Sequence, residues 1–255
     1  IKEEENFEEN SLIASQIWDN EYDVNDFQNF TRVLEKKMKK RRLYRLQILA
    51  SYHIAFSQNA CNFSVPGSGK TSIVYGAFSY FNNLQFNHKN YINKILVVGP
   101  PSSFSPWKDE FTECYGYEPS SVELDGSISL DKKKEILYGY DTKEYNLYLT
   151  TYQSVPSITQ ELIHFLNSKN NHVMMVCDEA HKIKSEDGVW AENILKMSPF
   201  ARSRIILTGT PVPNGYEDLF NLFKFIYPSR NVIKYKRDRL KLLSEKRIQS
   251  DIDQV

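Results

Sequence analysis

The chain has 255 residues, of which 41% are hydrophobic and 25% are charged, a composition that excludes a chain disordered over most of its length. Its 32 basic residues balance 32 acidic ones, so no net field attracts nucleic acid or an anionic membrane, and any electrostatic binding must come from local patches. The cysteines Cys61, Cys114 and Cys177 are too widely spaced for a zinc site and predict reduced thiols.

No apolar run approaches the roughly 20 residues that a membrane-spanning helix needs. The first residues are acidic, where a signal peptide would be basic. We therefore expect no contact with a membrane. The abundance of Asn, Lys, Ile and Tyr favours an AT-rich bacterial or viral genome. The expected location is then the cytoplasm, or the nucleus if the source is eukaryotic.

The N-terminal part of the sequence is helical in pattern. Residues 1–26 are acidic with scattered apolar residues at helical spacing, which predicts a peripheral helix. A basic run from Lys36 to Arg42 then leads into apolar residues at helical intervals, so we expect one helix over about 27–56. The basic run is interpreted as a solvated helix face, with a DNA-binding surface as the alternative. We assign residues 1–40 to a helical N-terminal extension.

After residue 56 the pattern changes to short apolar runs that alternate with helical stretches. The predicted strands are residues 60–65, 94–98, 122–124, 147–150, 173–177 and 204–207. The predicted helices are residues 71–81, 106–114, 130–139, 158–167, 189–196 and 216–226. This alternation is typical of an α/β fold, a parallel sheet of about six or more strands between helices. We assign it to one domain over 41–230, followed by a charged helical segment at 231–255.

The strongest motif is the sequence SVPGSGKT at residues 64–71, between a predicted strand and a predicted helix. Its glycines let backbone N–H groups surround a phosphate, Lys70 supplies a positive charge to the β and γ phosphates, and Thr71 offers a hydroxyl to Mg²⁺. Ser64 replaces the leading glycine of the pattern, which is tolerated if that position needs no positive φ. The predicted phosphate-binding residues are Pro66, Gly67, Ser68, Gly69, Lys70 and Thr71.

Two further motifs follow predicted strands. Asp178 and Glu179 come directly after the apolar run 173–177, where a parallel sheet presents groups to its ligand. We expect Asp178 to hold Mg²⁺ through water and Glu179 to orient and deprotonate the attacking water. With Lys70, they are the predicted catalytic residues. The third motif runs from Thr208 to Asn214, after the strand at 204–207.

In this order, the three motifs resemble those of the first RecA-like lobe of a superfamily-two helicase of the DEAH-box kind. The stretch from Leu207 to Asn214 is similar, more narrowly, to the third motif of the Swi/Snf-type DNA translocases. The resemblance implies a RecA-like fold, with ATP and Mg²⁺ as cofactors. It also implies duplex DNA, bound without regard to sequence, and a second RecA-like lobe as partners.

Weaker matches extend the resemblance. Residues 96–103 with the helix around Trp107, and then residues 149–152, are similar to segments of that family that contact DNA. The resemblance therefore implies nucleic-acid contacts by Ser102, Ser103, Lys108, Thr150 and Thr151. It also implies that the nucleotide state is coupled to the DNA surface through His181, Thr208, Gly209 and Thr210.

The stretch from Leu43 to Gln47 is similar to the element of the same family in which a glutamine reads adenine, so Gln47 is the implied adenine contact. The arginine and proline positions of that element hold Tyr44 and Arg45 in this chain. This departure makes adenine recognition by Gln47 the weakest part of the resemblance.

These features predict the ATP-binding motor lobe of a DNA-dependent ATPase that moves on duplex DNA and hydrolyses ATP to ADP and phosphate. By resemblance, hydrolysis also needs an arginine from a second lobe, which typically contributes about a thousandfold or more in rate, so we expect little activity from this lobe alone. One alternative is the motor lobe of an unwinding helicase or a restriction-type complex. An alternative of another class is a nucleotide-dependent interaction module without turnover.

Overall fold

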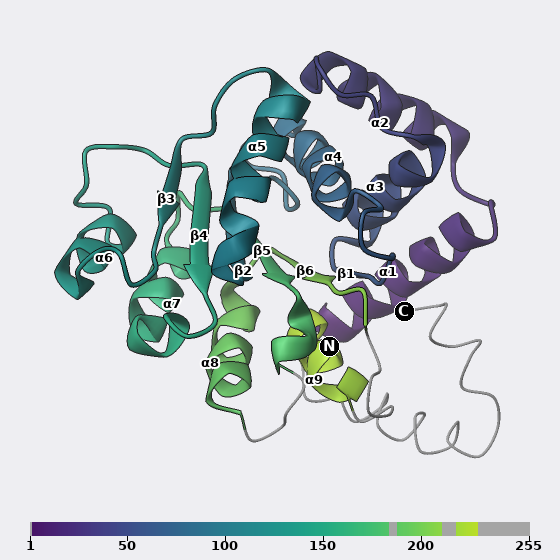
Figure 1. Ribbon diagram of the computed structural model, residues 1–255. Coiled ribbons are helices and arrows are strands. Elements are labelled where there is room, and N and C mark those ends of the chain that lie inside the picture. Colours follow the sequence, from purple (N-terminus) through teal and green to yellow (C-terminus); the bar gives the residue numbers. More distant parts are fainter. Residues whose placement is uncertain (1, 184–187, 211–217, 229–255) are drawn as a thin grey trace.

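A computed structural model describes residues 2–183, 188–210 and 218–228. Within these ranges the centre of the molecule is a parallel six-stranded sheet with the order β1-β6-β5-β2-β4-β3 (Figure 1). The strands are β1 (Ala60–Asn62), β2 (Lys94–Gly99), β3 (Ser121–Glu123), β4 (Leu147–Thr151), β5 (Val173–Asp178) and β6 (Ser203–Leu207). All six predicted strands are confirmed. Strand β1 is shorter than predicted because Ser64 turns back onto Asn62, whose Oδ1 accepts hydrogen bonds from its N–H and hydroxyl at 3.0 and 2.6 Å.

The helices predicted between and after the strands are present. They are α4 (Lys70–Asn83), α5 (Phe104–Tyr115), α6 (Leu130–Leu137), α7 (Thr159–Asn167), α8 (Val189–Met197) and α9 (Asp218–Ile226). Short 3₁₀ turns are η1 (Pro101–Ser103), η2 (Val155–Ser157), η3 (Ala180–Ile183) and η4 (Ser198–Phe200). The last part of the third motif, residues 211–214, and the predicted charged segment at 231–255 lie outside the described residues.

The N-terminal region differs from the prediction. Its helices are α1 (Lys2–Trp18), α2 (Val24–Lys37) and α3 (Arg45–Ser57), so the single helix predicted over 27–56 is wrong. Met38 and Leu43 are both buried, one just after α2 and the other just before α3. Helix α3 is capped at its N-terminus by the side chain of Gln47, whose Oε1 accepts a hydrogen bond from the N–H of Tyr44 at 3.0 Å. The chain therefore turns within the basic run.

The sheet is buried on both faces, and alternate residues of each strand face different cores. On β2, Ile95 and Val97 belong to a core that also contains residues of α1 to α5. Leu96 and Val98 belong to a second core, shared with residues of α6 to α9. This burial on both faces explains why the strands are nearly continuous apolar runs, as expected for a parallel sheet (Figure 1).

Aromatic side chains join the N-terminal helices to the first core. Phe30 of α2 is fully buried, and its ring centroid lies 5.4 Å from that of Tyr52 on α3 and 5.5 Å from that of Tyr80 on α4. At the other end of the extension, Phe7 of α1 packs edge to face against Tyr227, next to α9. The extension thus contacts the helical layers on both faces of the sheet: α4 on one face and the residue that follows α9 on the other.

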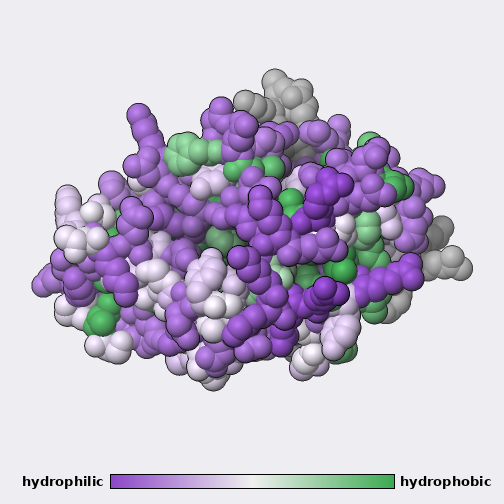
Figure 2. Space-filling model, turned by 90° about the horizontal axis from the view of Figure 1, so that it is seen from above, coloured by the Kyte–Doolittle hydropathy of each residue, from purple (hydrophilic) through white to green (hydrophobic). Residues whose placement is uncertain are grey.

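The face of the molecule that is seen from above is mainly polar (Figure 2). Seen from above, hydrophobic residues lie in small groups among hydrophilic ones (Figure 2). None of the helices that the structure describes has the length and apolar character to cross a membrane.

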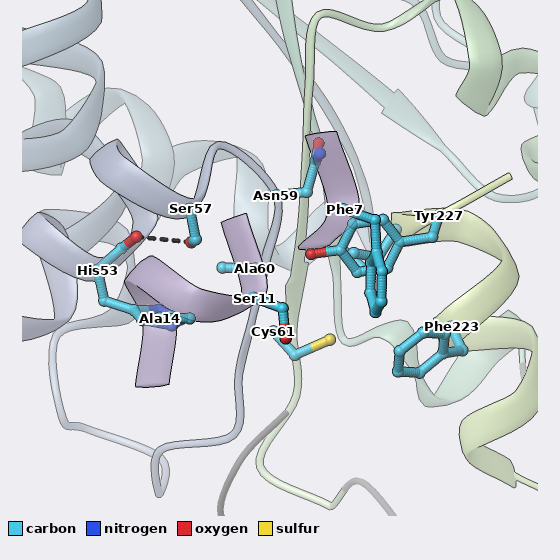
Figure 3. A pocket seen from close by; sticks show the side chains of 11 residues that line it. Phe7, Ser11, Ala14, His53, Ser57, Asn59, Ala60, Cys61, Phe223 and Tyr227 are labelled. Atoms are coloured by element: carbon cyan, nitrogen blue, oxygen red, sulfur yellow. Dashed lines mark hydrogen bonds between the residues drawn. The ribbon is translucent and has the colours of Figure 1, made fainter. Parts of the chain in front are cut away.

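A cavity of about 50 Å³ lies between α1, α3, α9 and the start of β1 (Figure 3). Its lining residues include Phe7, His53, Cys61 and Tyr227. It is far smaller than the roughly 300 Å³ or more of a typical small-molecule site. The cavity lies at residues 59–61, whereas the glycine-rich motif follows the other end of β1. It is therefore not the predicted nucleotide site.

Candidate functional site

The predicted motifs meet at one edge of the sheet. Each motif follows the carboxyl end of a strand, and the strand register aligns these ends. Gly99 of β2 is paired with Thr151 of β4, and Leu207 of β6 is paired with both Asp178 of β5 and Asn62 of β1. This edge is where open α/β sheets bind their ligands.

Two glycines of the glycine-rich loop adopt backbone conformations that residues with a Cβ rarely adopt. Gly67 and Gly69 have φ values of +81° and +80°, in the left-handed region that favours glycine. Ser64 does not have a positive φ, which agrees with the tolerance expected at that position. Helix α4 begins at Lys70, directly after the loop, so the N–H groups of its first turn face the loop. The hydroxyl of Ser68 is buried there without a hydrogen-bond partner.

The ammonium group of Lys70 lies within the loop. Its Nζ donates hydrogen bonds to the carbonyl oxygens of Ser64 at 3.0 Å and Val65 at 3.3 Å. The lysine is therefore held where a phosphate bound by the loop would be. Thr71, the predicted magnesium ligand of this motif, is the next residue in the first turn of α4.

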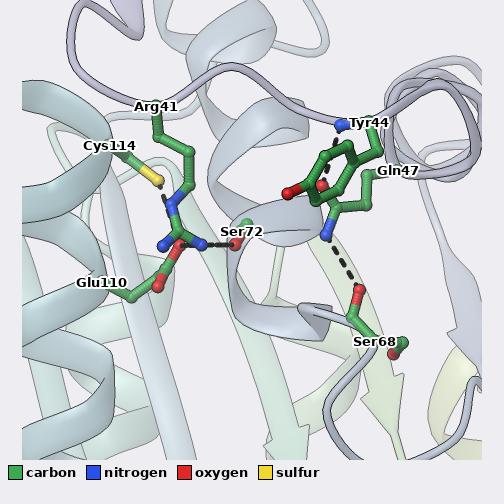
Figure 4. Close-up of polar contacts among 7 residues, drawn as sticks. All are labelled: Arg41, Tyr44, Gln47, Ser68, Ser72, Glu110 and Cys114. Atoms are coloured by element: carbon green, nitrogen blue, oxygen red, sulfur yellow. Dashed lines mark hydrogen bonds and ion pairs between the residues drawn. The ribbon is translucent and has the colours of Figure 1, made fainter.

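Gln47 supports the loop from the side (Figure 4). Its Nε2 donates to the carbonyl of Ser68 at 2.9 Å, while its Oε1 accepts from the N–H of Tyr44 at 3.0 Å. A Cβ atom placed on Gly69 would collide with Nε2 of Gln47. The predicted adenine contact is thus a side chain that fixes the phosphate loop. Adenine recognition by Gln47 stays a prediction.

The basic run contributes one cation to a polar cluster beside the first turn of α4 (Figure 4). Arg41 forms an ion pair with Glu110 of α5 at 2.9 Å and donates to Ser72 of α4 at 3.3 Å. Ser72 donates a short hydrogen bond to the same carboxylate, and Cys114 lies 3.6 Å from it. Arg41 therefore joins the turn between α2 and α3 to both α4 and α5. This contact was missed because its partners are distant in sequence.

Asp178 is held by two hydrogen bonds at the end of β5. Its Oδ2 accepts from Nε1 of Trp107 at 3.0 Å, and its Oδ1 accepts from the N–H of Glu179 at 3.0 Å. Burial raises the pKa of Asp178, and the Trp107 hydrogen bond and the charge of Lys70 oppose this increase. The two predicted catalytic groups Lys70 and Asp178 are thus close enough to interact electrostatically.

Glu179 has a φ of +52°, a left-handed conformation that is unfavourable for a residue with a Cβ. Its Oε2 lies 3.3 Å from Nδ1 of His181. The carbonyl of Asp178, just before it, accepts a hydrogen bond from the hydroxyl of buried Tyr152 at 2.8 Å. Such strained residues often occur at functional sites, where the surrounding contacts maintain them.

The third motif lies against the phosphate loop. The N–H of Thr208 donates to the carbonyl of Asn62 at 3.2 Å, and the Thr208 hydroxyl accepts from the N–H of Thr210 at 3.2 Å. A Cβ atom on Gly209 would lie 3.1 Å from Cδ of Pro66. Asn62 thus joins the first and third motifs, a role that the sequence analysis missed. Its spacing from Ser64, typical of an Asx turn, is the signal that could have indicated it.

Three of the five predicted nucleic-acid contacts lie at or near the surface. Ser102 is exposed in η1, and the hydroxyl of Ser103 donates to the carbonyl of Pro100 at 2.8 Å. Lys108 of α5 is partly exposed and forms an ion pair with Glu123 at 2.6 Å. These residues form the accessible part of the predicted DNA surface.

The other two predicted contacts are buried. Thr150 is fully buried, and its hydroxyl donates to the carbonyl of Leu124 at 3.1 Å. In this position the Thr150 hydroxyl is engaged within the protein, and a contact between Thr150 and nucleic acid stays a prediction. Thr151 is 5% exposed, and its hydroxyl donates to that of Ser154 at 3.0 Å. The side chains of β4 are buried because both faces of the sheet are covered, which the two threonines in the sequence did not reveal.

Residues 14–234 match the family model of the SNF2-related domain. The chain belongs to this family. The match includes all the described motif residues and most of the helical N-terminal extension. The predicted family resemblance is confirmed.

Curated proteins similar to this SNF2-related domain match it over about half of its length. One is the "SWI/SNF-related matrix-associated actin-dependent regulator of chromatin subfamily A containing DEAD/H box 1" of Xenopus tropicalis, 33% identical over 135 residues, or 52% of this chain and 13% of that protein. Another is the human "DNA repair and recombination protein RAD54B", 28% identical over 148 residues, or 56% of this chain and 14% of that protein. The match thus covers only a small part of each relative.

A solved structure with a similar fold is titled "Sulfolobus solfataricus SWI2/SNF2 ATPase core in complex with dsDNA". It superimposes with a TM-score of 0.58 and 23% sequence identity, covering 80% of this chain and 40% of that chain. Together with the parallel sheet and its two helical layers, this similarity confirms the predicted RecA-like α/β fold.

Proposed function

We propose that this SNF2-related domain is the ATP-binding lobe of a DNA-dependent ATPase that moves along duplex DNA and hydrolyses ATP to ADP and phosphate. The observation that carries the proposal is the meeting of the phosphate loop, Asp178 with Glu179, and the third motif at one sheet edge. The names of the relatives, which include the yeast "ATP-dependent helicase FUN30", and the DNA-bound Sulfolobus ATPase core support it.

The residues of the loop fit a triphosphate. Two left-handed glycine positions on either side of Ser68, Gly67 and Gly69, direct backbone N–H groups into the loop, and the buried hydroxyl of Ser68 has no hydrogen-bond partner within the protein. Thr71 and Asp178 are the proposed magnesium ligands, and their oxygens are of the kind that Mg²⁺ prefers. When bound, Mg²⁺ neutralises charge on the β and γ phosphates.

The chain's own residues have distinct tasks in this proposal. Lys70 exchanges its two loop carbonyls for phosphate oxygens, which are stronger acceptors because they are charged. Glu179 orients the attacking water and accepts its proton, and His181 lies within ion-pair distance of that carboxylate. Thr208, Gly209 and Thr210 connect the loop to the neighbouring strand and are the proposed coupling residues.

Duplex DNA is the proposed partner, bound through its phosphates at Ser102, Ser103 and Lys108. Binding of this kind depends on salt and is indifferent to base sequence. A second RecA-like lobe is the other proposed partner. It supplies an arginine to the γ-phosphate, so the isolated lobe binds ATP but hydrolyses it weakly.

The test is Glu179→Gln, made in a chain that carries both proposed lobes and assayed with and without duplex DNA. Loss of the general base is expected to reduce DNA-stimulated turnover by about 100-fold or more. ATP affinity should change by less than about threefold, because a base that acts on water makes no ground-state contact with ATP. Exposed Glu192, which pairs with Lys196 at 2.7 Å, gives the matched control Glu192→Gln.

Three results would contradict the proposal. Unchanged turnover in Glu179→Gln would remove the assigned role of that residue. ATP binding with no turnover under any condition would favour the interaction module. ATP-dependent separation of the two DNA strands, measured with a labelled duplex, would favour an unwinding helicase over a translocase.

A further inference from the structure

We propose that Trp107 is a positioning residue that couples the DNA-contacting segment to the magnesium ligand Asp178. The inference rests on the proposed function and deepens it, because it assigns a route by which DNA can act on the nucleotide site. It does not involve His181 or the third motif.

The first observation is a hydrogen bond between distant parts of the chain. Trp107 lies in α5, between Ser103 and Lys108 of the proposed DNA surface, and it is fully buried. Its Nε1 donates to Oδ2 of Asp178 at 3.0 Å. An indole N–H is only a donor, so it fixes one carboxylate oxygen and leaves the remaining lone pairs of Asp178 in a defined direction.

The second observation is a close approach at Gly99. A Cβ atom placed there would lie 2.8 Å from Oγ of Ser103 and 3.2 Å from Cβ of Asp178. The backbone of Gly99 therefore lies between the turn that carries the proposed DNA contacts and the acidic side chain. A movement of that turn would therefore displace Asp178 through the backbone of Gly99 as well as through α5.

The third observation concerns the helix of the phosphate loop. The hydroxyl of Tyr75 on α4 donates to the carbonyl of Trp107 at 2.6 Å, and the two rings meet edge to face at 5.4 Å. Trp107 thus contacts the helix that begins at Lys70 as well as Asp178. Because these contacts are buried and close-packed, α5 cannot move without changing one of them.

The indole N–H distinguishes coupling from packing. Trp107→Phe retains an aromatic ring in the core but removes the donor to Asp178. Tyr75→Phe is the matched control, since it removes a hydrogen bond to the same tryptophan and leaves the Asp178 contact intact. Both variants retain every proposed ligand of ATP, Mg²⁺ and DNA.

The experiment measures the affinity for ATP in the chain with both proposed lobes, with and without duplex DNA, over a range of Mg²⁺ concentrations. In the wild type, saturating DNA is expected to change the affinity for Mg²⁺·ATP by about 5- to 150-fold, the usual range for coupled sites. In Trp107→Phe, the ratio of the Mg²⁺·ATP affinities with and without DNA should fall to within twofold of one. The Mg²⁺ concentration that gives half-maximal ATP binding should rise. ATP affinity without Mg²⁺ should be unchanged. Tyr75→Phe should retain both wild-type values.

Two results would overturn the inference. The first is a Trp107→Phe variant in which DNA changes the affinity for Mg²⁺·ATP as much as in the wild type, at the same Mg²⁺ concentrations. The second is a Tyr75→Phe variant that loses the effect of DNA to the same extent as Trp107→Phe, which would show that Trp107 acts only through packing. A wild-type chain that does not bind ATP or does not respond to DNA would contradict the proposed function itself, and the inference with it.

A second measurement avoids any variant at Trp107. The 255-residue sequence has three tryptophans, so in this lobe Trp18→Phe with Trp190→Phe leaves Trp107 as the only one. Its fluorescence should change when Mg²⁺·ATP is added and change again when DNA is added, because both act on its hydrogen-bonded partner. A spectrum that responds to neither addition, in a protein that binds both, would equally overturn the coupling.

Discussion

The phosphate loop allows a quantitative test at Gly69. Its φ is +80° and its ψ is 38°, and a side chain in this left-handed conformation costs about 1–2 kcal/mol. A methyl group at this position would also collide with Nε2 of Gln47. Gln47 would have to release its 2.9 Å hydrogen bond to Ser68, a loss of about 0.5–1.5 kcal/mol. Gly69→Ala is therefore expected to destabilise the fold by about 1.5–3.5 kcal/mol.

Gly67 provides the matched control in the same loop. Its φ of +81° imposes the same conformational cost, but no atom lies within 4 Å of a Cβ placed there. Gly67→Ala should therefore cost only about 1–2 kcal/mol. The difference between the two alanine variants measures the contact with Gln47.

The assay is urea unfolding of Gly69→Ala, Gly67→Ala and Gln47→Ala, together with both double variants. In the Gln47→Ala background the collision is absent, so the cost of Gly69→Ala should fall to that of Gly67→Ala. The resulting coupling energy is about 1 kcal/mol, whereas Gly67 should show no coupling to Gln47. Equal costs for the two glycines, or additivity of Gly69→Ala with Gln47→Ala, would refute the reasoning.

Two further predictions concern stability. Arg41→Gln should destabilise the fold by about 1–2 kcal/mol, because partly buried Glu110 loses its cation. Arg42→Gln, at the exposed neighbouring position, should have little effect, so equal urea midpoints for the two variants would contradict the prediction. Burial lowers the pKa of His53 from 6.5 to about 4, so the unfolded chain binds this proton more readily than the folded one. Stability from this histidine is present above pH 6.5 and is lost as the pH falls towards 4, by no more than about 3 kcal/mol. His53→Asn should reduce that slope in urea unfolding at several pH values, and parallel wild-type and variant curves would contradict it.

The sheet and its motifs could be predicted because their signals are local. Each strand of a parallel sheet that is buried on both faces is a short apolar run, as residues 173–177 illustrate. The glycine-rich loop also combines a conformational requirement, a charge and a hydroxyl within eight residues. The residues that carry the chemistry are therefore recognised from short stretches of sequence. Their convergence then follows from the common direction of the strands.

What the sequence did not reveal depends on contacts between distant residues. The break between α2 and α3 results from the burial of Met38 and Leu43, and helical periodicity alone could not distinguish it from a continuous helix. The burial of Thr150 depends on the helices and loops that cover the two faces of the sheet. The hydrogen bond from Trp107 to Asp178 joins residues 71 positions apart. Local propensity contains no information about such pairs.

The polar groups of the phosphate loop fall into two kinds, and the difference bears on how ATP would be held. Lys70 already has partners in the protein, the carbonyls of Ser64 and Val65, so a phosphate would replace existing hydrogen bonds there. The Ser68 hydroxyl has no hydrogen-bond partner in the protein, so a bond from it to phosphate would not require the loss of an existing hydrogen bond. If the loop binds ATP as proposed, affinity at Lys70 would arise from the difference between a neutral carbonyl and a charged oxygen. This difference would grow with the charge of the polyphosphate, so the proposal predicts that the loop binds the triphosphate more tightly than the diphosphate.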